Sequence, residues 1–317
     1  MTARLPVSQG IEVPNEDSDS CESHCGQATT LPFYVTYSSA AAPVPDPWPQ
    51  GDPEGLEYHQ ANLSWQRDWT YRRVSAGAAA HSSSASPGET SVINVEGGND
   101  YANGYFLYAL DSPELKAQLD AGAWRGGINC TAYAAAEQRA YGFYHWFKLN
   151  ASDAITPFLS LNATHTGTAT GLSKMPYLRD TRRSSRVSRP AVSFCEGFVT
   201  FFCKGLGGFR LLYDNISADD GGGTAVRWSD TVGLGEYLFA DIHKMTADTC
   251  PLPHYIKPDA HVLPFFIPFR ALTVDGHPNV LVAGKNMAAS FFANAATRVH
   301  PNEYSSGVAA GVAAAIM

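Results

Sequence analysis

The sequence predicts an α/β protein in which a β-rich region at residues 31–262 is followed by a strand and a helix within 263–317. The unbroken apolar run 280–283 (VLVA) is typical of a short strand buried on both faces of a parallel sheet. Residues 31–37 (LPFYVTY) show the alternation that predicts a strand with one buried face. Residues 305–316 combine serine, glycine, alanine and valine in a pattern that predicts a helix with few bulky side chains.

The composition is that of a globular protein, because 44% of the residues are hydrophobic and only 16% are charged. A net charge of -8 and a pI of about 5.6 argue against nucleic acid or an anionic membrane as the main partner. No run of 18 apolar residues occurs, so we expect no membrane-spanning helix. The six cysteines include no Cys-x-x-Cys pair, which argues against zinc ribbons and ferredoxin-type clusters. We therefore expect a soluble protein without a metal site.

The sequence does not decide in which cellular compartment the protein works. The first residues lack the apolar core of a signal peptide. Five Asn-x-Ser/Thr triplets nevertheless point faintly to a secretory route, at Asn62, Asn129, Asn150, Asn162 and Asn215.

Residues 1–30 are mostly polar and show no continuous apolar pattern, which predicts a disordered leader. After the strand at 31–37, residues 63–71 (LSWQRDWTY) are interpreted as a second strand, because aromatic residues are common in this segment and favour strands. A helix is expected near 113–121, because Asp111 and Ser112 offer capping side chains immediately before a proline.

A second helix is expected near 131–147, with Asn129 as its cap. Its apolar side chains follow helical spacing and should face the core: Tyr133, Ala136, Ala140, Tyr144 and Phe147.

The glycines of the terminal helix have two explanations. Gly307 and Gly311 are four residues apart and so lie on one side of the helix. Either the helix packs very closely on a sheet, or a ligand lies against its start, where unpaired N–H groups and the helix dipole favour an electron-rich group.

Several blocks resemble the carboxyl-terminal end of FAD-dependent oxidoreductases, in the flavoprotein class of fumarate reductase and glutathione reductase. They are 175–183 (MPYLRDTRR), 266–272 (FIPFRAL), 279–287 (NVLVAGKNM), 296–301 (ATRVHP) and 307–311 (GVAAG). The resemblance implies a Rossmann-like FAD-binding domain with a substrate domain above the isoalloxazine ring. It also implies cofactor contacts from Gly284, Lys285, Asn286 and Met287 at the ribityl and pyrophosphate, and from Ser305, Ser306, Gly307 and Val308 at the pyrimidine.

Candidate catalytic residues combine this resemblance with charge. Arg179, Arg182 and Arg183 are costly to bury unless a carboxylate or another anion meets them, although Asp180 could pair with one while solvent covers the others. Arg298 resembles, by its position before the helix, the substrate-facing arginine of the fumarate reductase group.

Two histidines are candidates for moving a proton. If residues 240–243 form a strand, Asp241 shares a face with His243 and can orient its imidazole; alternatively His243 is merely hydrogen-bonded. His300 lies two residues after Arg298 and is placed similarly.

The resemblance is interrupted twice. Residues 185–204 intervene as a possible insertion. The Gly-x-Gly-x-x-Gly segment that grips the ADP half of FAD does not occur in the sequence. We therefore expect an amino-terminally incomplete member of the family, which by itself may lack activity.

The leading hypothesis is an FAD-dependent oxidoreductase, or the substrate and flavin-end part of one, that transfers hydride between a small organic substrate and the flavin. The competing hypothesis is a non-catalytic binding module, possibly secreted, whose tryptophans form a carbohydrate or protein surface.

Overall fold

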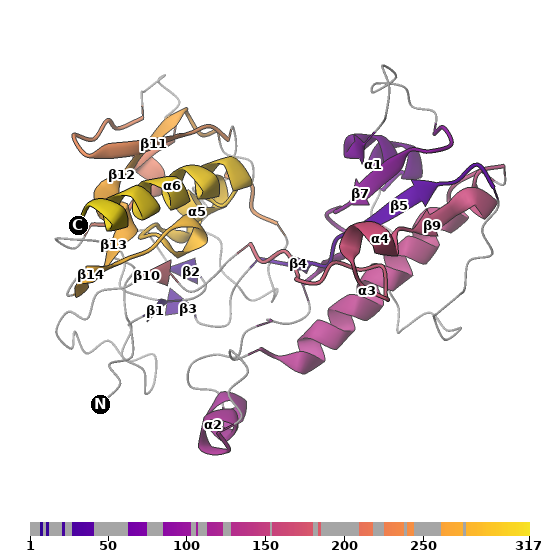
Figure 1. Ribbon diagram of the computed structural model, residues 1–317, viewed down its shortest axis with the longest axis horizontal. Coiled ribbons are helices and arrows are strands. Elements are labelled where there is room, and N and C mark those ends of the chain that lie inside the picture. The colour runs from indigo at the N-terminus through magenta and orange to yellow at the C-terminus, as the bar shows by residue number, and fades with distance from the viewer. Residues whose placement is uncertain are drawn as a thin grey trace. The chain divides into compact units, whose positions relative to one another are not determined.

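The computed structural model describes residues 7–8, 11–12, 21–22, 27–40, 63–74, 85–102, 106, 113–122, 128–152, 154–179, 183–184, 209–217, 225–237, 240–243, 261–274 and 277–317. The chain forms two compact units. The sheet unit contains residues 28–108 and 113–178, and the C-terminal unit contains 1–27, 109–112 and 179–317. The chain thus divides near residue 179, so that 179–262 cluster with the terminal segment and not with the predicted β-rich region. Helices and strands occur in both units (Figure 1).

The sheet unit is built on four antiparallel strands in the order β6-β7-β5-β9. These are β6 (Arg73–Val74), β7 (Thr90–Ile93), β5 (Phe33–Tyr37) and β9 (Leu159–Leu161). The strand expected at 31–37 is confirmed, because Phe33 and Val35 are fully buried and Tyr37 is partly buried on the same face. A further pair joins β4 (Thr29–Thr30) to β8 (Asp100–Tyr101).

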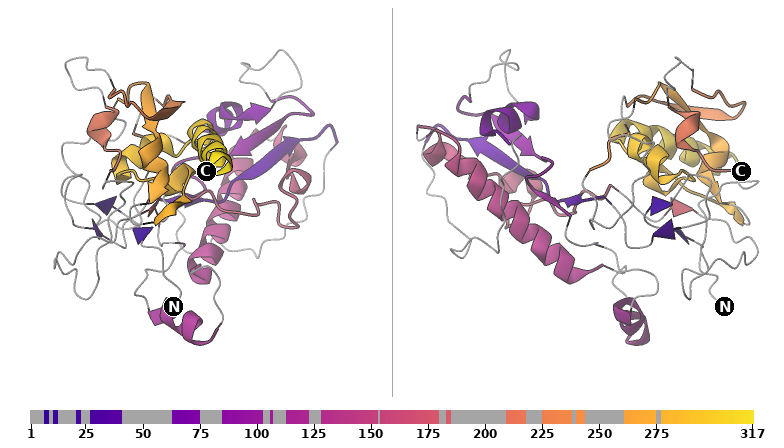
Figure 2. Two further views of the ribbon diagram at one scale, coloured as in Figure 1. Left: turned by 60° about the vertical axis from the view of Figure 1, so that its left-hand side comes forward. Right: turned by 180° about the vertical axis from the view of Figure 1, so that it is seen from behind.

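The long helix α3 (Cys130–Leu149) covers this sheet (Figure 2). Asn129 caps it by accepting a hydrogen bond from the backbone N–H of Ala132, as expected from the sequence. The ring of Phe33 on β5 lies 6.5 Å from that of Phe143 and 6.0 Å from that of Tyr144. Such edge-on ring contacts between helix and strand fix the packing of the two layers.

The strand expected at 63–71 is wrong, because this segment is the helix α1 (Trp65–Tyr71). Ser64 caps the helix by accepting from the N–H of Arg67. Trp65 and Trp69 are four residues apart, so a helix places both on one face, and both rings contact Phe147. The tryptophan spacing therefore fits a helix that packs on α3 better than a strand.

The other helices of this unit are short. The expected helix near 113–121 is confirmed as α2 (Pro113–Asp120), and Gly122 follows it with a φ of 64°. The helix α4 (Ala163–Thr166) and the 3-10 turn η1 (Thr156–Phe158) flank β9.

Three of the glycosylation-type asparagines have structural roles. Asn129 and Asn162 cap α3 and α4, and Asn215 accepts from the N–H of Leu212. Asn150 is exposed at the end of α3, and Asn62 lies outside the described residues.

The C-terminal unit contains antiparallel pairs of short strands. They are β1 (Val7–Ser8) with β10 (Arg183–Ser184), β2 (Ile11–Glu12) with β3 (Cys21–Glu22), β11 (Thr231–Gly235) with β12 (Phe265–Pro268), and β13 (Thr273–Val274) with β14 (His277–Leu281). Parts of the expected leader are thus paired as strands. The possible insertion at 185–204 lies outside the described residues.

The expected parallel strand at 280–283 is wrong. β14 ends at Leu281, pairs antiparallel with β13 and is only partly buried. Only two residues separate these strands, and they are Asp-Gly, a strong hairpin signal. A parallel pair would need a crossover of about a dozen residues, so the short connection decides the direction.

Two helices complete the unit, the fully buried α5 (Phe291–Thr297) and the terminal α6 (His300–Ile316). The 3-10 turns are η3 (Tyr213–Asn215), η4 (Phe269–Leu272) and η5 (Gly284–Asn286). No helix in the described ranges is long and apolar enough to cross a membrane.

The terminal helix begins at His300 and not at Ser305. Pro301 lies in its first turn, where the missing N–H of proline costs nothing. The helix crosses β11 closely: a Cβ added at Gly233 would lie 2.7 Å from Ser305 Oγ. Helix and sheet thus pack closely at Gly233 of the strand. Close packing at Gly307 and Gly311 is not found, because a Cβ added at either would meet nothing within 4 Å.

Candidate active site

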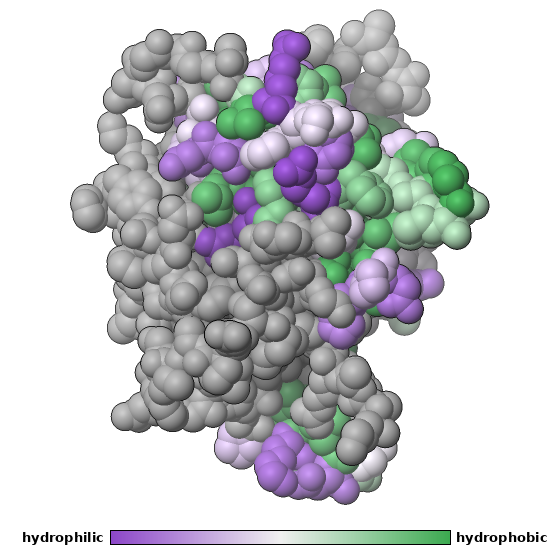
Figure 3. Space-filling model, turned by 90° about the vertical axis from the view of Figure 1, so that its left-hand side faces the viewer, coloured by the Kyte–Doolittle hydropathy of each residue, from purple (hydrophilic) through white to green (hydrophobic). Residues whose placement is uncertain are grey.

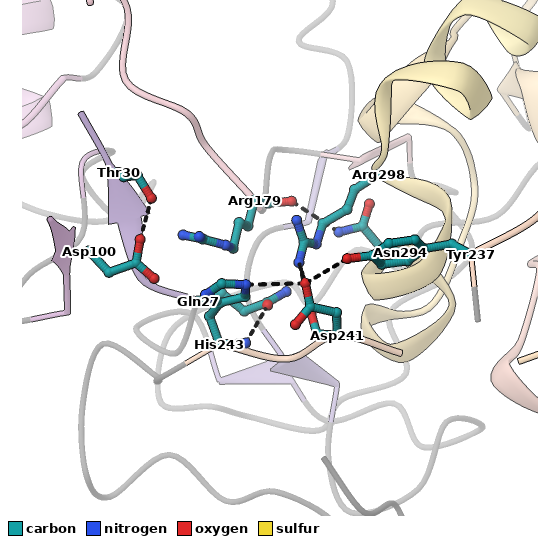
Figure 4. A network of polar contacts seen from close by, with 9 residues as sticks. All are labelled: Gln27, Thr30, Asp100, Arg179, Tyr237, Asp241, His243, Asn294 and Arg298. Carbon is teal, nitrogen blue, oxygen red and sulfur yellow. Dashed lines mark hydrogen bonds and ion pairs between the residues drawn. The ribbon is translucent and has the colours of Figure 1, made fainter. Parts of the chain in front are cut away.

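A polar network in the C-terminal unit is centred on the carboxylate of Asp241 (Figure 4). Its Oδ2 accepts a 2.8 Å hydrogen bond from the hydroxyl of Tyr237 and lies 3.1 Å from Nη2 of Arg298. The same oxygen lies 3.1 Å from Nε2 of His243. Nη2 of Arg298 also donates to the backbone carbonyl of Asp241 at 2.8 Å. One carboxylate thus joins a phenol, a guanidinium and an imidazole.

Backbone contacts hold the members of this network in place. Arg298 is the C-cap of α5, and its N–H donates to the carbonyl of Asn294. Because all seven residues of α5 are buried, this anchor is well fixed. The N–H of His243 donates to Oε1 of Gln27 at 3.0 Å. Residues 240–243 do not form the strand on which the shared face was predicted. The side chains of Asp241 and His243 nevertheless contact each other at 3.1 Å.

The charges of the network keep Asp241 ionised. Burial by itself would raise the pKa of this carboxyl group. The hydrogen bond and charge of His243, the charge of Arg298 and the hydroxyl of Tyr237 outweigh burial and hold the pKa well below its usual range. Asp241 is therefore an acceptor only, and the Arg298 side chain, 3% exposed, finds its counter-charge inside the protein.

The structure brings some of the expected catalytic residues together and leaves others apart. His243 and Arg298 meet at Asp241. Arg179 is buried, and its carbonyl oxygen accepts from Nδ2 of Asn294, one turn before Arg298. His300 is exposed at the start of α6.

The remaining two arginines have no described side chain. Arg182 lies outside the described residues, and Arg183 is described only as part of β10.

Three network residues were missed by sequence reasoning. Tyr237 lies four positions before Asp241, and that short spacing could have suggested it. Asn294 precedes Arg298 by one helical turn, which could have placed it beside the site. Gln27 lies 216 positions from His243, and no local pattern indicates such a contact.

The residues expected to hold a cofactor also meet, at the contact between η5 and α6. Gly284 has a φ of 59°, and its N–H donates to Ser306 Oγ at 2.9 Å. Nζ of Lys285 lies 2.8 Å from Oε1 of Glu303. We call these two contacts the η5 latch. They place the two predicted stretches side by side, but turn Ser306 and Lys285 toward protein partners.

The expectation that amides of 305–308 form a helix start is wrong. These residues lie in the second turn and beyond, where backbone N–H groups bond within the helix. Ser305 lies against β11, Ser306 is 1% exposed and bonded to Gly284, and Met287 is buried. The positive end of the helix dipole lies instead at His300, beside Arg298.

The outer side of α6 is open. A Cβ added at Gly307 or Gly311 would meet nothing within 4 Å. Val308 and Val312 are about half exposed on this helix. Figure 3 shows hydrophobic residues gathered on one part of the face drawn there.

Residues 206–317 match the family model described as FAD dependent oxidoreductase. The matched segment includes the Asp241 network except Gln27 and Arg179, and all of η5 and α6. No curated protein and no solved structure matches the chain.

FAD is the cofactor of this family. Of the two sides of α6, only the outer one leaves room for such a group. Between Gly284 and Ser306 it does not fit, because the latch closes that space. On the outer side, Gly307 and Gly311 present backbone without side chains, so a flat ring can approach closely. Asn286 is exposed on the adjoining turn and carries amide hydrogen-bonding groups.

Proposed function

Because residues 206–317 match the family model described as FAD dependent oxidoreductase, we propose that the protein works as an FAD-dependent oxidoreductase on a small organic substrate. It would do so either by itself or as the substrate and flavin-end portion of a longer enzyme. The observation that carries the proposal is the Asp241 network, which joins an imidazole and a guanidinium inside the matched segment.

The residues of the network have chemically distinct roles. His243 holds or moves the proton that accompanies oxidation or reduction of the substrate. Arg298 binds or polarises an anionic or carbonyl group of the substrate. Arg179, buried next to α5, adds a second positive charge. Arg182, Arg183 and His300 remain predictions from the sequence.

Bound FAD would supply the acceptor or donor of a hydride. Of the expected cofactor-binding residues, Asn286, Gly307 and Val308 are accessible as the structure stands. Gly284 and Lys285 contact Ser306 and Glu303 in the η5 latch, so their contact with the cofactor stays a prediction from the resemblance.

A surface of tryptophans receives no support. Trp65 is 6% exposed and Trp69 is fully buried, so neither can form a carbohydrate-binding platform. Trp146 and Trp228 are only partly buried, so the non-catalytic binding module loses the support of Trp65 and Trp69 alone.

An absorption scan of the purified chain, before and after addition of FAD and removal of the unbound excess, tests the proposal. Flavin bands that stay with the protein support it. A chain that retains FAD only when an upstream Gly-x-Gly-x-x-Gly segment is supplied supports the longer-enzyme form. A chain that retains no FAD in either arm contradicts the proposal.

A further inference from the structure

The triplet Asn150-Ala151-Ser152 lies where α3 ends, and it is accessible to solvent. Asn150 and Ser152 are both exposed, whereas Ala151 between them is 7% exposed. The N–H of Ala151 donates to the carbonyl of Lys148 at 3.1 Å and anchors the triplet to the helix. The two residues that define an Asn-x-Ser/Thr triplet are therefore presented at the surface, on backbone that the helix holds.

We propose that Asn150 is an acceptor site for an N-linked oligosaccharide. Such a group is bulky and hydrated, so a folded protein accommodates it only on the surface. The donor is an oligosaccharide carried on a lipid pyrophosphate, and a transferase of the secretory pathway catalyses the transfer. The proposal concerns chains that enter that pathway, and it is independent of flavin chemistry.

The side-chain amide of Asn150 can take the sugar without losing its contact with the helix. Nδ2 donates to the carbonyl of Trp146 at 2.9 Å. A side-chain amide carries two hydrogens on this nitrogen, and the contact uses one of them. Because the sugar replaces the other hydrogen, Asn150 remains the C-cap of α3 after modification.

The transfer forms one bond and breaks one. Nδ2 of Asn150 forms a bond to the anomeric carbon of the first sugar and gives up one proton. The bond between that carbon and the pyrophosphate oxygen breaks, and the lipid pyrophosphate leaves with the electron pair. No oxidant or reductant takes part.

The other described triplets have less accessible asparagines. Asn129, Asn162 and Asn215 are each partly buried. Asn162 also turns Nδ2 toward Oγ1 of Thr36 on β5, at 2.8 Å, so that a sugar on this nitrogen would crowd the sheet. Among the triplets that the structure describes, Asn150 alone has an exposed asparagine.

Expression of the full chain behind a secretory signal peptide in eukaryotic cells tests the site. Chains from the medium and from the lumen of the secretory organelles are analysed together, so retention inside the cell does not hide the result. Enzymatic release of the sugar in oxygen-18 water converts each occupied asparagine to a labelled aspartate, which peptide mass spectrometry locates. We expect label at Asn150 in most chains, and an Asn150 without label would overturn the inference.

Three substitutions separate the acceptor chemistry from effects on the fold. Asn150→Gln removes the acceptor, and Ser152→Ala keeps the asparagine and its contact with Trp146 but removes the hydroxyl of the triplet. We expect both variants to lose the label at this position. Asn162→Gln is the matched control, because it alters a partly buried triplet, and the label at Asn150 should persist. Label concentrated on the partly buried asparagines instead, or label at Asn150 that persists in Ser152→Ala, would contradict the proposal.

Discussion

At the scale of single residues, one carboxylate oxygen of Asp241 contacts Tyr237, His243 and Arg298. The sequence allowed Asp241 and His243 to be paired from their spacing, and it singled out Arg298 from the resemblance. It could not show that Arg298 pairs with Asp241, because 57 positions separate the two residues in the sequence. The guanidinium of Arg298, which was expected to face a substrate, therefore also contacts and orients Asp241.

Acid should destabilise the folded protein through Asp241. The pKa of its carboxyl group is lower in the folded chain than its ordinary value of 3.8. The folded state therefore gains stability above that value and loses it as the pH falls through the lower, folded-state pKa. We expect the melting temperature of Asp241→Asn to fall less than that of the wild type between neutral and strongly acid pH.

Asp120 provides the matched control for this measurement. It pairs with Lys116 on the surface, where its side chain is 64% exposed. Asp120→Asn should keep the acid dependence of the wild type. A wild-type dependence in Asp241→Asn as well would argue against an ionised, buried Asp241.

Removal of the Arg298 side chain should show how much its contact with Asp241 contributes to the free energy of unfolding. Arg298→Ala leaves a partly buried carboxylate without its arginine partner, which costs about 3 kcal/mol of the free energy of unfolding. In urea denaturation of Arg298→Ala, Asp241→Asn and the double variant, we expect the double variant to lose clearly less than the two single losses combined. Strict additivity would mean that the ion pair contributes nothing.

At the scale of elements, the sequence predicted best where a local signal was sufficient. The capping residue Asn129 and the helical spacing of apolar residues after it predicted α3. A proline that follows two capping residues predicted α2. The segment of α1 was misread because aromatic residues favour strands, whereas packing of Trp65 and Trp69 on one neighbour decides for a helix. The start of α6 was placed too late because His300 and Pro301 look like a loop, although proline suits a first helical turn.

Two glycines near α6 should respond to alanine in opposite directions. A Cβ at Gly235 would lie 2.3 Å from the ring of Phe265 and 2.9 Å from Oδ1 of Asn302, so Gly235→Ala should lose about 2 kcal/mol through overpacking. Gly307 is exposed in the helix with nothing near, so Gly307→Ala should gain about 1 kcal/mol from helix propensity.

Urea denaturation of the two alanine variants measures both effects. If both variants were equally stable, α6 would not cross β11 as closely as described. A destabilising Gly307→Ala would indicate that protein atoms already cover the open side.

At the scale of the whole molecule, the sequence predicted mixed helix and sheet but not the division of the chain. Residues 179–262 carry Asp241 and His243 and cluster with the terminal helices. No composition shift marks a boundary at 179, and contacts such as Gln27 with His243 join distant segments, so only the folded chain shows the grouping. The family match at 206–317 falls within this unit.

Under the proposed function, this unit presents the open side of α6 to a flavin. Titration of FAD, followed by quenching of its fluorescence, tests it with two leucine variants of exposed small residues on α6. Gly307→Leu fills the open backbone surface, whereas Ala314→Leu adds the same bulk further along the helix. The account predicts that the wild type and Ala314→Leu bind FAD alike and that Gly307→Leu binds at least about tenfold more weakly, a loss of about 1.4 kcal/mol. Equal binding by all three proteins would contradict it, and so would a failure of all three to bind FAD both with and without a supplied upstream Gly-x-Gly-x-x-Gly segment.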